Sequence, residues 1–358
     1  MKQGSTFETL ERKINATAYL AEDFVLDGKR LEMTPDGKAF YHDLPDFAPH
    51  SNITDVAHQQ IGSRLGIPRA YYQHMREEKP ELLATNVNAW LAGSGKHMLR
   101  AVSNHQSDYI EKGDFTRALL SDRYRRIDNN QVLDTLMPKI AEKEHRISSC
   151  ELTPYNMFVK VTFPFAQAEV AKGDVIEAGV MIRNSEVGYG SCSVALFIHR
   201  LVCENGMWVP ETIFNARKYH SGPKLAVDSD DRIISDHTRI LEDQAHMSSL
   251  HDVIDAARSE KTIKKIAQDF RDASEDVIEG EVVEVVERLS KRLLITKDEQ
   301  AQVRENLVRD GDFSRWGFAN AVTRTAQDVG SYDRATELEK LGGQVIAMSS
   351  KEFTKLAA

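Results

Sequence analysis

A chain of 358 residues with 41% hydrophobic and 28% charged residues has the composition of a globular protein, which excludes a disordered or low-complexity chain. Its apolar runs are far shorter than the roughly 20 residues that a membrane-spanning helix needs, and its first residues lack the apolar region of a signal peptide, so we expect a cytoplasmic protein with no membrane partner. The formal net charge of −9 disfavours a general attraction to nucleic acid, so a nucleic-acid site would need a local cluster of cations.

Turn signals separate short apolar runs near the start of the chain. The pairs Asp27-Gly28 and Asp36-Gly37 lie between the runs 24–26, 30–33 and 39–41. Asp-Gly pairs favour tight hairpin turns, so we predict a small β-meander here.

A pair of helices is predicted next. Thr54 or Asp55 can cap a helix that Gly66 ends, and Pro68 can begin a second helix. The same spacing occurs in the helix-turn-helix motifs that read DNA, but packing between two helices is its commoner use. After this pair we expect strands at 98–102 and 116–120 and a helix at 130–144.

The middle of the chain has the strongest strand pattern. Apolar and polar residues alternate over 155–163 and over 176–182, and a third run covers 191–203. Turn-forming residues at 184–190 and the pair Asn205-Gly206 favour hairpins between the strands. We therefore predict three or four antiparallel strands in succession.

The last third of the chain has helical periodicity. Apolar residues fall on one helix face over 263–270 and again over 282–293. Thr296 and Glu299 fit a capping box, and Gly342-Gly343 predicts the end of a late helix.

Together these elements predict an α+β protein. Its N-terminal and central regions are rich in antiparallel strands, and its C-terminal third is helical. The changes of pattern divide the chain into an N-terminal α+β region at 1–130, a central antiparallel region at 131–227 and a helical region at 228–358. We find no linker between these regions, so they can pack as one body.

The candidate functional residues lie at the end of the N-terminal region, where four arginines and a tyrosine gather in a chain that is acidic overall. Guanidinium groups match phosphate oxygens, and an aromatic ring can stack on an unpaired base, so the cluster predicts a nucleic-acid site. An equally favoured alternative is that the arginines pair with neighbouring aspartates and hold a turn. The predicted contacts are Arg117, Arg123, Tyr124, Arg125 and Arg126, extended by Arg183 and Arg200 and by His199, Arg217 and Lys218.

The sequence contains no catalytic constellation. The three cysteines form no Cys-x-x-Cys pair, and the glycine-rich stretch at 93–97 lacks the spacing of a phosphate loop. His42, Asp43, Asp46 and His50 could converge on a metal ion, although they show no His-x-x-x-His or Glu-x-x-His spacing. We predict no catalytic residue, no cofactor and no metal, and an enzyme that uses some of these four residues is a third possibility behind the two hypotheses given below.

Motifs in four parts of the chain resemble a known family. The chain is similar to the phage and plasmid proteins grouped as domain of unknown function 932, in the segments 65–72, 117–129, 184–206 and 316–322. The resemblance implies a mobile genetic element as the setting, where neighbouring genes serve replication, recombination or defence, and it implies no catalytic residue. The strands and helix at 155–218 are also similar in outline to the core of phage single-strand annealing proteins.

These observations lead to two hypotheses about function. The first is an accessory protein of a phage or plasmid that binds or anneals single-stranded DNA in recombination or replication, as a homo-oligomer. The alternative is a protein-binding or structural module, such as an inhibitor or assembly factor acting on a host system, whose working surface is the acidic stretch at 275–287. The exposure of Arg123, Arg125 and Arg126 distinguishes the two.

Overall fold

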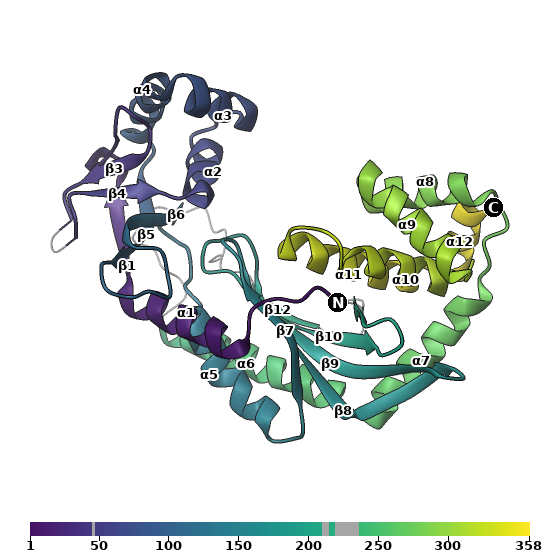
Figure 1. The fold of residues 1–358 in the computed structure, drawn as a ribbon. Helices are drawn as coiled ribbons and strands as arrows, with labels where there is room; N and C mark the ends of the chain where they lie inside the picture. The colour runs from purple at the N-terminus through teal and green to yellow at the C-terminus, as the bar shows by residue number, and fades with distance from the viewer. Residues whose placement is uncertain (45–46, 210–214, 219–235) are drawn as a thin grey trace.

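The computed structural model describes residues 1–44, 47–209, 215–218 and 236–358. In these residues the chain forms two six-stranded sheets with helices packed on them, and a group of helices follows the second sheet (Figure 1). The predicted α+β class is confirmed, with antiparallel strands in the N-terminal and central regions and a helical last third. No helix of the described residues is long and apolar enough to cross a membrane.

The first sheet has the strand order β1-β5-β6-β4-β3-β2. Its neighbouring strands are antiparallel, except that β4 and β6 run parallel. The strands predicted at 98–102 and 116–120 are its inner strands β5 and β6. The bounds are Ala21–Asp27 for β1, Leu31–Met33 for β2, Ala39–His42 for β3, His50–Ile53 for β4, Lys96–Asn104 for β5 and Gly113–Ser121 for β6.

The predicted meander begins one strand later than expected. β1 pairs with β5 and not with β2, so the hairpin predicted at Asp27-Gly28 is wrong. Gly28 instead begins a short 3₁₀ turn, Gly28–Arg30, and a side chain at Gly28 would meet the Leu91 carbonyl at 2.0 Å. Glycine therefore serves close packing at this position. The meander consists of β2, β3 and β4, and its first turn contains Gly37 at φ +67°.

Three helices cover one face of the first sheet: α2 (Asp55–Arg64), α3 (Arg69–Glu78) and α4 (Pro80–Leu91). Thr54 caps α2 as predicted, because its hydroxyl accepts a hydrogen bond from the N–H of Ala57. These helices and the sheet enclose a buried apolar core that includes Leu26, Phe40, Ile61, Met75, Leu83 and Leu99.

The second sheet has the order β7-β8-β9-β10-β11, with β12 also paired to β10, and all its pairs are antiparallel. The three predicted runs are β8, β9 and β10, which confirms a succession of antiparallel strands. The turn predicted at Asn205-Gly206 lies at 201–204 instead, and both residues belong to β11. The bounds are Arg146–Leu152 for β7, Met157–Ala171 for β8, Asp174–Asn184 for β9, Cys192–Arg200 for β10, Asn205–Trp208 for β11 and Asn215–Lys218 for β12.

Helices lie on both faces of the second sheet (Figure 1). The apolar side chains of one face share a core with α5 (Asn129–Ala141), α6 (Asp236–Ala257) and α7 (Glu260–Glu275). On the other face α11 (Tyr332–Ala347) packs along β11, next to α10 (Arg315–Thr325). The remaining helices are α1 (Phe7–Leu20), which contacts β7, and α8 (Val282–Leu293), α9 (Lys297–Asp310) and α12 (Ser350–Ala357) in the C-terminal third.

Two sequence signals in the C-terminal third have different outcomes. The capping box is confirmed, because Thr296 and Glu299 each accept a hydrogen bond from the other's backbone N–H. The helix end predicted at Gly342-Gly343 is wrong, because α11 continues through both glycines to Ala347. A side chain at Gly343 would meet the Trp208 carbonyl at 1.9 Å, so glycine here lets α11 approach β11 closely.

A buried ion pair also joins α11 to the second sheet. The Lys160 ammonium group lies 2.6 Å from the Glu339 carboxylate, and both side chains are fully buried. The ammonium group also lies 4.9 Å from the centre of the Tyr332 ring, whose hydroxyl shares a hydrogen bond with Ser149. Burial lowers the pKa of Lys160, and the neighbouring Glu339 opposes that effect.

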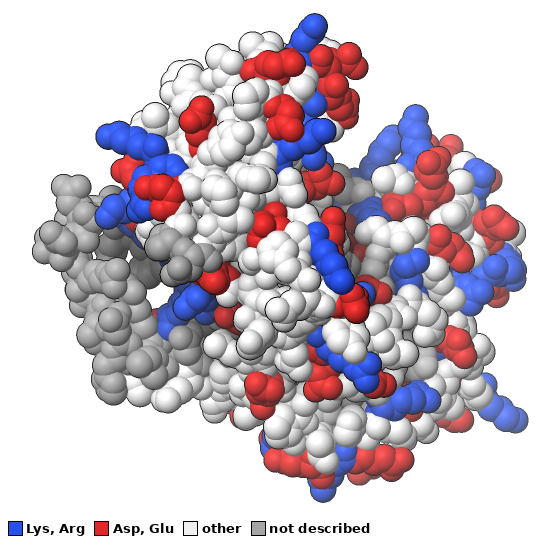
Figure 2. All heavy atoms as spheres, turned by 60° about the vertical axis from the view of Figure 1, so that its left-hand side comes forward, with Lys and Arg blue, Asp and Glu red and all other residues white. Residues whose placement is uncertain are grey.

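Charged side chains of both signs are mixed over the surface. Figure 2 shows Lys and Arg interspersed with Asp and Glu on one face, without an extended area of one sign. A phosphate-binding site on this face must therefore be a small group of neighbouring cations.

Candidate functional site

The predicted arginine cluster lies in the segment that connects the two sheets. β6 ends at Ser121, the N–H of Tyr124 donates back to the Ser121 carbonyl at 2.9 Å, and α5 begins at Asn129. The loop between β9 and β10 packs here against the first sheet. Residues of both parts share a small apolar cluster: Val56, Met98, Ala118, Leu120 and Val187.

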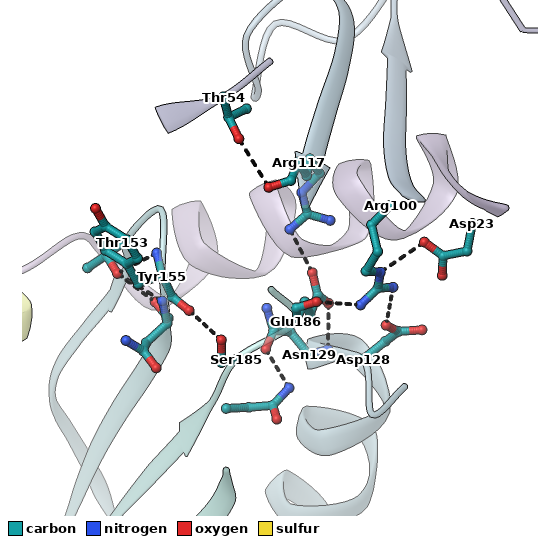
Figure 3. Close-up of polar contacts among 12 residues, drawn as sticks. Asp23, Thr54, Arg100, Arg117, Asp128, Asn129, Thr153, Tyr155, Ser185 and Glu186 are labelled. Atoms are coloured by element: carbon teal, nitrogen blue, oxygen red, sulfur yellow. Dashed lines mark hydrogen bonds and ion pairs between the residues drawn. The ribbon is translucent and has the colours of Figure 1, made fainter. Parts of the chain in front are cut away.

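Arg100 of β5 is the centre of this interface, although it was not predicted as a site residue. Its side chain is 2% exposed and donates hydrogen bonds to Asp23 of β1 at 2.9 Å and to Asp128 at 2.7 Å (Figure 3). It also donates to the Glu186 carbonyl at 2.8 Å. Burial opposes the charge, but the two aspartates outweigh it and raise the pKa of Arg100. An arginine inside the apolar run 98–102 was the available signal, since a buried cation needs anionic partners.

Glu186 supplies the anion on the side of the second sheet. Its carboxylate lies 2.9 Å from Arg117 and accepts a hydrogen bond from the Asn129 N–H at 2.8 Å (Figure 3). Burial would raise the pKa of Glu186, but Arg117 and the Asn129 N–H lower it below its usual range. Arg117 therefore has an internal anionic partner. We call the five residues Asp23, Arg100, Arg117, Asp128 and Glu186 the inter-sheet network.

Two further predicted arginines also pair with acids. Arg126 is 54% exposed and lies 2.8 Å from the second carboxylate oxygen of Asp23. Arg125 lies 3.3 Å from Glu242 of α6 and is 19% exposed. Arg117, Arg125 and Arg126 therefore pair with acids, as the structural alternative expects, but none of these acids is one of the neighbouring aspartates.

Arg123 differs from the other three arginines. It is exposed at the turn after β6, and among the described residues it has no hydrogen bond or ion pair. Its neighbour Tyr124 is held in place, because the tyrosine hydroxyl donates to the Ser185 carbonyl at 2.9 Å and its ring packs beside Val187. Burial also raises the pKa of Tyr124. Arg123 is therefore a cation on an anchored turn, and Tyr124 is its anchor and not an exposed ring.

The two predicted extensions of the surface have partners elsewhere. Arg183 donates to the Asn156 side chain at 3.0 Å. Arg200 makes two bonds to Asp174, at 2.6 and 2.9 Å, and lies near the other end of β10 from the residue paired with Arg183. Arg200 therefore does not extend the surface around Arg123. His199 is buried, and the side chains of Arg217 and Lys218 lie outside the described residues.

Three of the four segments that carry the family resemblance contact one another. Segment 117–129 contacts the start of segment 184–206 through the inter-sheet network. The end of that second segment contacts 316–322, because the Arg200 guanidinium lies 5.4 Å from the centre of the Trp316 ring and Asn205 donates to the Asn320 carbonyl. Each contact joins parts of the chain that are distant in sequence, so these motifs have a structural explanation.

Exposed cations from two other elements lie at the same end of the first sheet as Arg123. Arg64, at the end of α2, donates to the Leu119 carbonyl at 3.4 Å, and Lys96 begins β5 beside the end of β1. Both are exposed. Leu119, which accepts from Arg64, pairs with Leu99 of β5, so Arg64 lies toward the start of β5. Two acids also lie at this end: Asp27 pairs with Lys96 in the sheet, and Asp122 directly follows β6. We call Arg64, Lys96 and Arg123 the basic end of the first sheet.

An exposed aromatic residue lies near the basic end. Trp90, in the last turn of α4, is 61% exposed. The chain returns from this turn to β5 through Ser94, whose hydroxyl shares a hydrogen bond with His97 at 2.5 Å. Sequence reasoning missed Trp90, Arg64 and Lys96, because they belong to three separate elements and no local pattern connects them.

The residues weighed as a metal loop do not gather in the described part of the chain. His42 is buried with neither ring nitrogen hydrogen-bonded, and burial lowers its pKa. Asp43 pairs with Arg30 at 2.7 Å, His50 is exposed, and Asp46 lies outside the described residues. No group of three or more potential metal ligands is found among the residues described.

No protein-family model matches the chain, and neither a curated protein nor a solved structure matches it. The resemblance to the family of unknown function therefore stays a prediction from the motifs.

Proposed function

We propose that the protein binds single-stranded nucleic acid at the basic end of the first sheet, as an accessory protein of a phage or plasmid in recombination or replication. The observation that carries the proposal is Arg123, an exposed arginine without a partner among the described residues, on a turn that Tyr124 anchors. The setting in a mobile element comes from the family resemblance. Compared with the cluster predicted from sequence, Arg123 is kept as a contact and Arg64 and Lys96 are added.

The proposed contacts divide into phosphate and base contacts. Arg64, Lys96 and Arg123 neutralise phosphates, and Trp90 stacks on an unpaired base. A stacked base contributes about 1–3 kcal/mol to binding, and it must be free of its pairing partner to reach the ring. The anchored turn reduces the entropy that binding costs, because Arg123 is already held near the bound position.

Fluorescence anisotropy with a labelled single-stranded oligonucleotide tests the phosphate contacts. Each neutralised phosphate contributes about −0.7 to the slope of log affinity against log salt, so three contacts give about −2. The triple variant Arg64→Ala, Lys96→Ala, Arg123→Ala should bind more weakly and lose this slope. The control is Lys172→Ala, which removes an exposed cation in the distant turn between β8 and β9 and should change neither quantity.

Trp90→Ala tests the base contact separately. We expect it to weaken binding of the single strand by about 1–3 kcal/mol and to leave the salt slope unchanged, because stacking displaces no counterions. Duplex of the same sequence should bind more weakly than the single strand and should not respond to this substitution. Equal binding of both forms by the wild type would contradict a single-strand site.

Two results of these measurements would refute the proposal. One is the absence of oligonucleotide binding at low salt, and the other is unchanged binding by the triple variant. A chain that binds no oligonucleotide would leave the alternative of a protein-binding module that acts on a host system.

A further inference from the structure

The two edge strands of the first sheet differ in the hydrogen-bond partners of their outward-facing backbone groups. At the β2 edge, the Asn88 side chain of α4 accepts a hydrogen bond from the Met33 N–H at 2.7 Å and donates one to the Met33 carbonyl at 3.0 Å. The amide of Asn88 thus takes the place of a further strand. This closes the β2 edge against another chain.

The β1 edge has no such closure. In the part of the chain that the structure describes, the backbone of Ala21–Asp27 pairs with β5 on one side and with nothing on the other. The pairing with β5 runs without a bulge over all seven residues of β1. β1 contains no proline, lysine or bulge. It does carry three acids, Glu22, Asp23 and Asp27, and such charges also protect an edge unless the register keeps them apart.

Apolar side chains accompany this open edge. Val25 of β1 is 53% exposed, and Tyr19, at the end of α1 just before the strand, is 88% exposed. A straight edge strand with exposed apolar residues is a surface on which another strand can pair.

We propose that β1 pairs in antiparallel orientation with β1 of a second copy of this chain, so that the two first sheets form one continuous sheet. The arrangement is a two-fold pairing in which the same strand serves both copies. It goes beyond the proposed function, because it uses neither the basic end nor Trp90.

The length and the charges of β1 together favour one register for this pairing, because an axis near either end of the strand pairs only a few of its residues. A two-fold axis perpendicular to the sheet keeps the faces of both copies aligned, so it must pass through a residue paired with its own copy. An axis at Asp23 places Asp23 opposite the partner's Asp23, and an axis at Val25 places Asp23 opposite the partner's Asp27. An axis at Phe24 places Asp23 opposite the partner's Val25 and Glu22 opposite the partner's Leu26. Like charges directly opposite each other are destabilising, so the Phe24 register is favoured.

The inter-sheet network also suits β1 to self-pairing. Asp23 is the acid nearest the centre of this register, and it already bonds to Arg100 and Arg126 within its own chain. Its charge is therefore compensated before a second copy arrives. In the Phe24 register Glu22 faces the partner's Leu26 and Asp27 faces the partner's Ala21, so neither carboxylate lies opposite another acid.

The experiment uses the full chain at a series of concentrations. Light scattering coupled to size-exclusion chromatography should give a mass that rises from one copy to two. Hydrogen exchange followed by mass spectrometry should show that the β1 amides gain protection over the same range, by at least tenfold in exchange rate for those that bond across the two-fold axis. Amides of β2, at the closed edge, are the internal control and should not change.

Proline variants test the contact directly. The N–H groups of Glu22 and Val25 point in opposite directions, because neighbouring positions along a strand alternate between the two edges. In Glu22→Pro and Val25→Pro, one proline removes an outward N–H and the other removes a bond to β5. The variant that keeps the melting temperature of the wild type identifies the outward position, and it should be monomeric at every concentration.

Two results would overturn the proposal. One is a wild-type chain that stays monomeric at the highest soluble concentration. The other is a dimer whose β1 amides remain unprotected, since that dimer uses another surface. Because oligonucleotide binding is measured separately, either result leaves the proposed function standing.

Discussion

Arg100 and Asp23 face each other across β5 and β1, and the Arg100 guanidinium donates to the Asp23 carboxylate at 2.9 Å while both side chains are buried. The same guanidinium reaches Asp128, just before α5, and the Glu186 carbonyl in the loop after β9. One side chain therefore connects two strands of the first sheet to the segment before α5 and to the loop between β9 and β10. Three of the four arginines predicted to hold phosphates, Arg117, Arg125 and Arg126, also pair with acids from distant parts of the chain.

Arg100→Met should strongly destabilise the protein. It leaves Asp128 without its arginine and removes one of the two partners of Asp23, and breaking a buried ion pair from one side costs about 3–5 kcal/mol. Urea unfolding monitored by circular dichroism measures the free energy of unfolding. Arg126→Ala is the control, because Arg126 also pairs with Asp23 but is 54% exposed, and its loss should cost less than about 1 kcal/mol. Equal losses in the two variants would show that burial is not the cause.

The buried ion pair between Lys160 of β8 and Glu339 of α11 can be tested with a double mutant. Lys160→Met or Glu339→Leu alone should each cost about 3–5 kcal/mol, because each leaves an unpaired charge in a fully buried site. The double variant should recover most of that loss, since two apolar residues need no partner. The free energies of unfolding of all four proteins give the coupling. A double variant as unstable as the sum of the two single variants would contradict this account.

Glu299 predicts a pH dependence with a defined direction. The Arg334 guanidinium donates two hydrogen bonds to its carboxylate, each of 2.7 Å, and lowers the pKa of Glu299 to about 2 from its ordinary value near 4.5. A lowered pKa in the folded state stabilises the protein above the ordinary value, and this stabilisation is lost as the pH falls toward 2. Glu299→Gln keeps the capping box but not the charge.

The test of this effect is the free energy of unfolding measured between pH 4.5 and 2. The difference between the wild type and Glu299→Gln should be largest at the top of this range and should shrink toward its bottom. Glu305→Gln, an exposed carboxylate of the same helix, is the control and should follow the wild type. A constant difference at every pH would mean that the charge of Glu299 is not involved.

Gly343→Ala tests the close approach of α11 to β11. The added methyl group would lie 1.9 Å from the Trp208 carbonyl, so helix and strand must separate, and we expect a loss of about 1–3 kcal/mol. Gly330→Ala is the control, because a side chain there meets nothing within 4 Å. That change should be neutral or stabilising by about 0.4–1 kcal/mol. Thermal unfolding compares the two variants, and a neutral Gly343→Ala would refute the packing argument.

The sequence allowed the prediction of elements whose pattern is local. β8 and β9 follow a period of two, and the capping box of α9 needs only Thr296 and Glu299. The pairing of β1 with β5 could not be predicted, because an Asp-Gly pair indicates a turn without indicating which strand pairs with which. Gly343 shows the same limit of local sequence patterns. A glycine that ends a helix and a glycine that lets a helix pack closely look the same in sequence, and only the position of Trp208 in the fold distinguishes them.

The candidate site could be predicted only in part, for a similar reason. The grouping of arginines at 117–126 is visible in the sequence, but their partners Glu186 and Glu242 lie far along the chain. Whether each arginine is free or paired is a property of tertiary contacts. Arg123 remains as a proposed contact, while Arg64, Lys96 and Trp90 join it only when three elements come together in space.

Asn88 has a consequence for how copies of this protein can add to one another. Fibre growth through sheet edges requires that every copy present two open edges, one to receive a neighbour and one to offer to the next. The Asn88 amide closes one edge of the first sheet by occupying the backbone of Met33. A self-complementary pairing at β1 would use up the remaining edge of that sheet in both copies. Growth through the first sheet would then stop at two copies, because Asn88 already occupies the only other edge of that sheet.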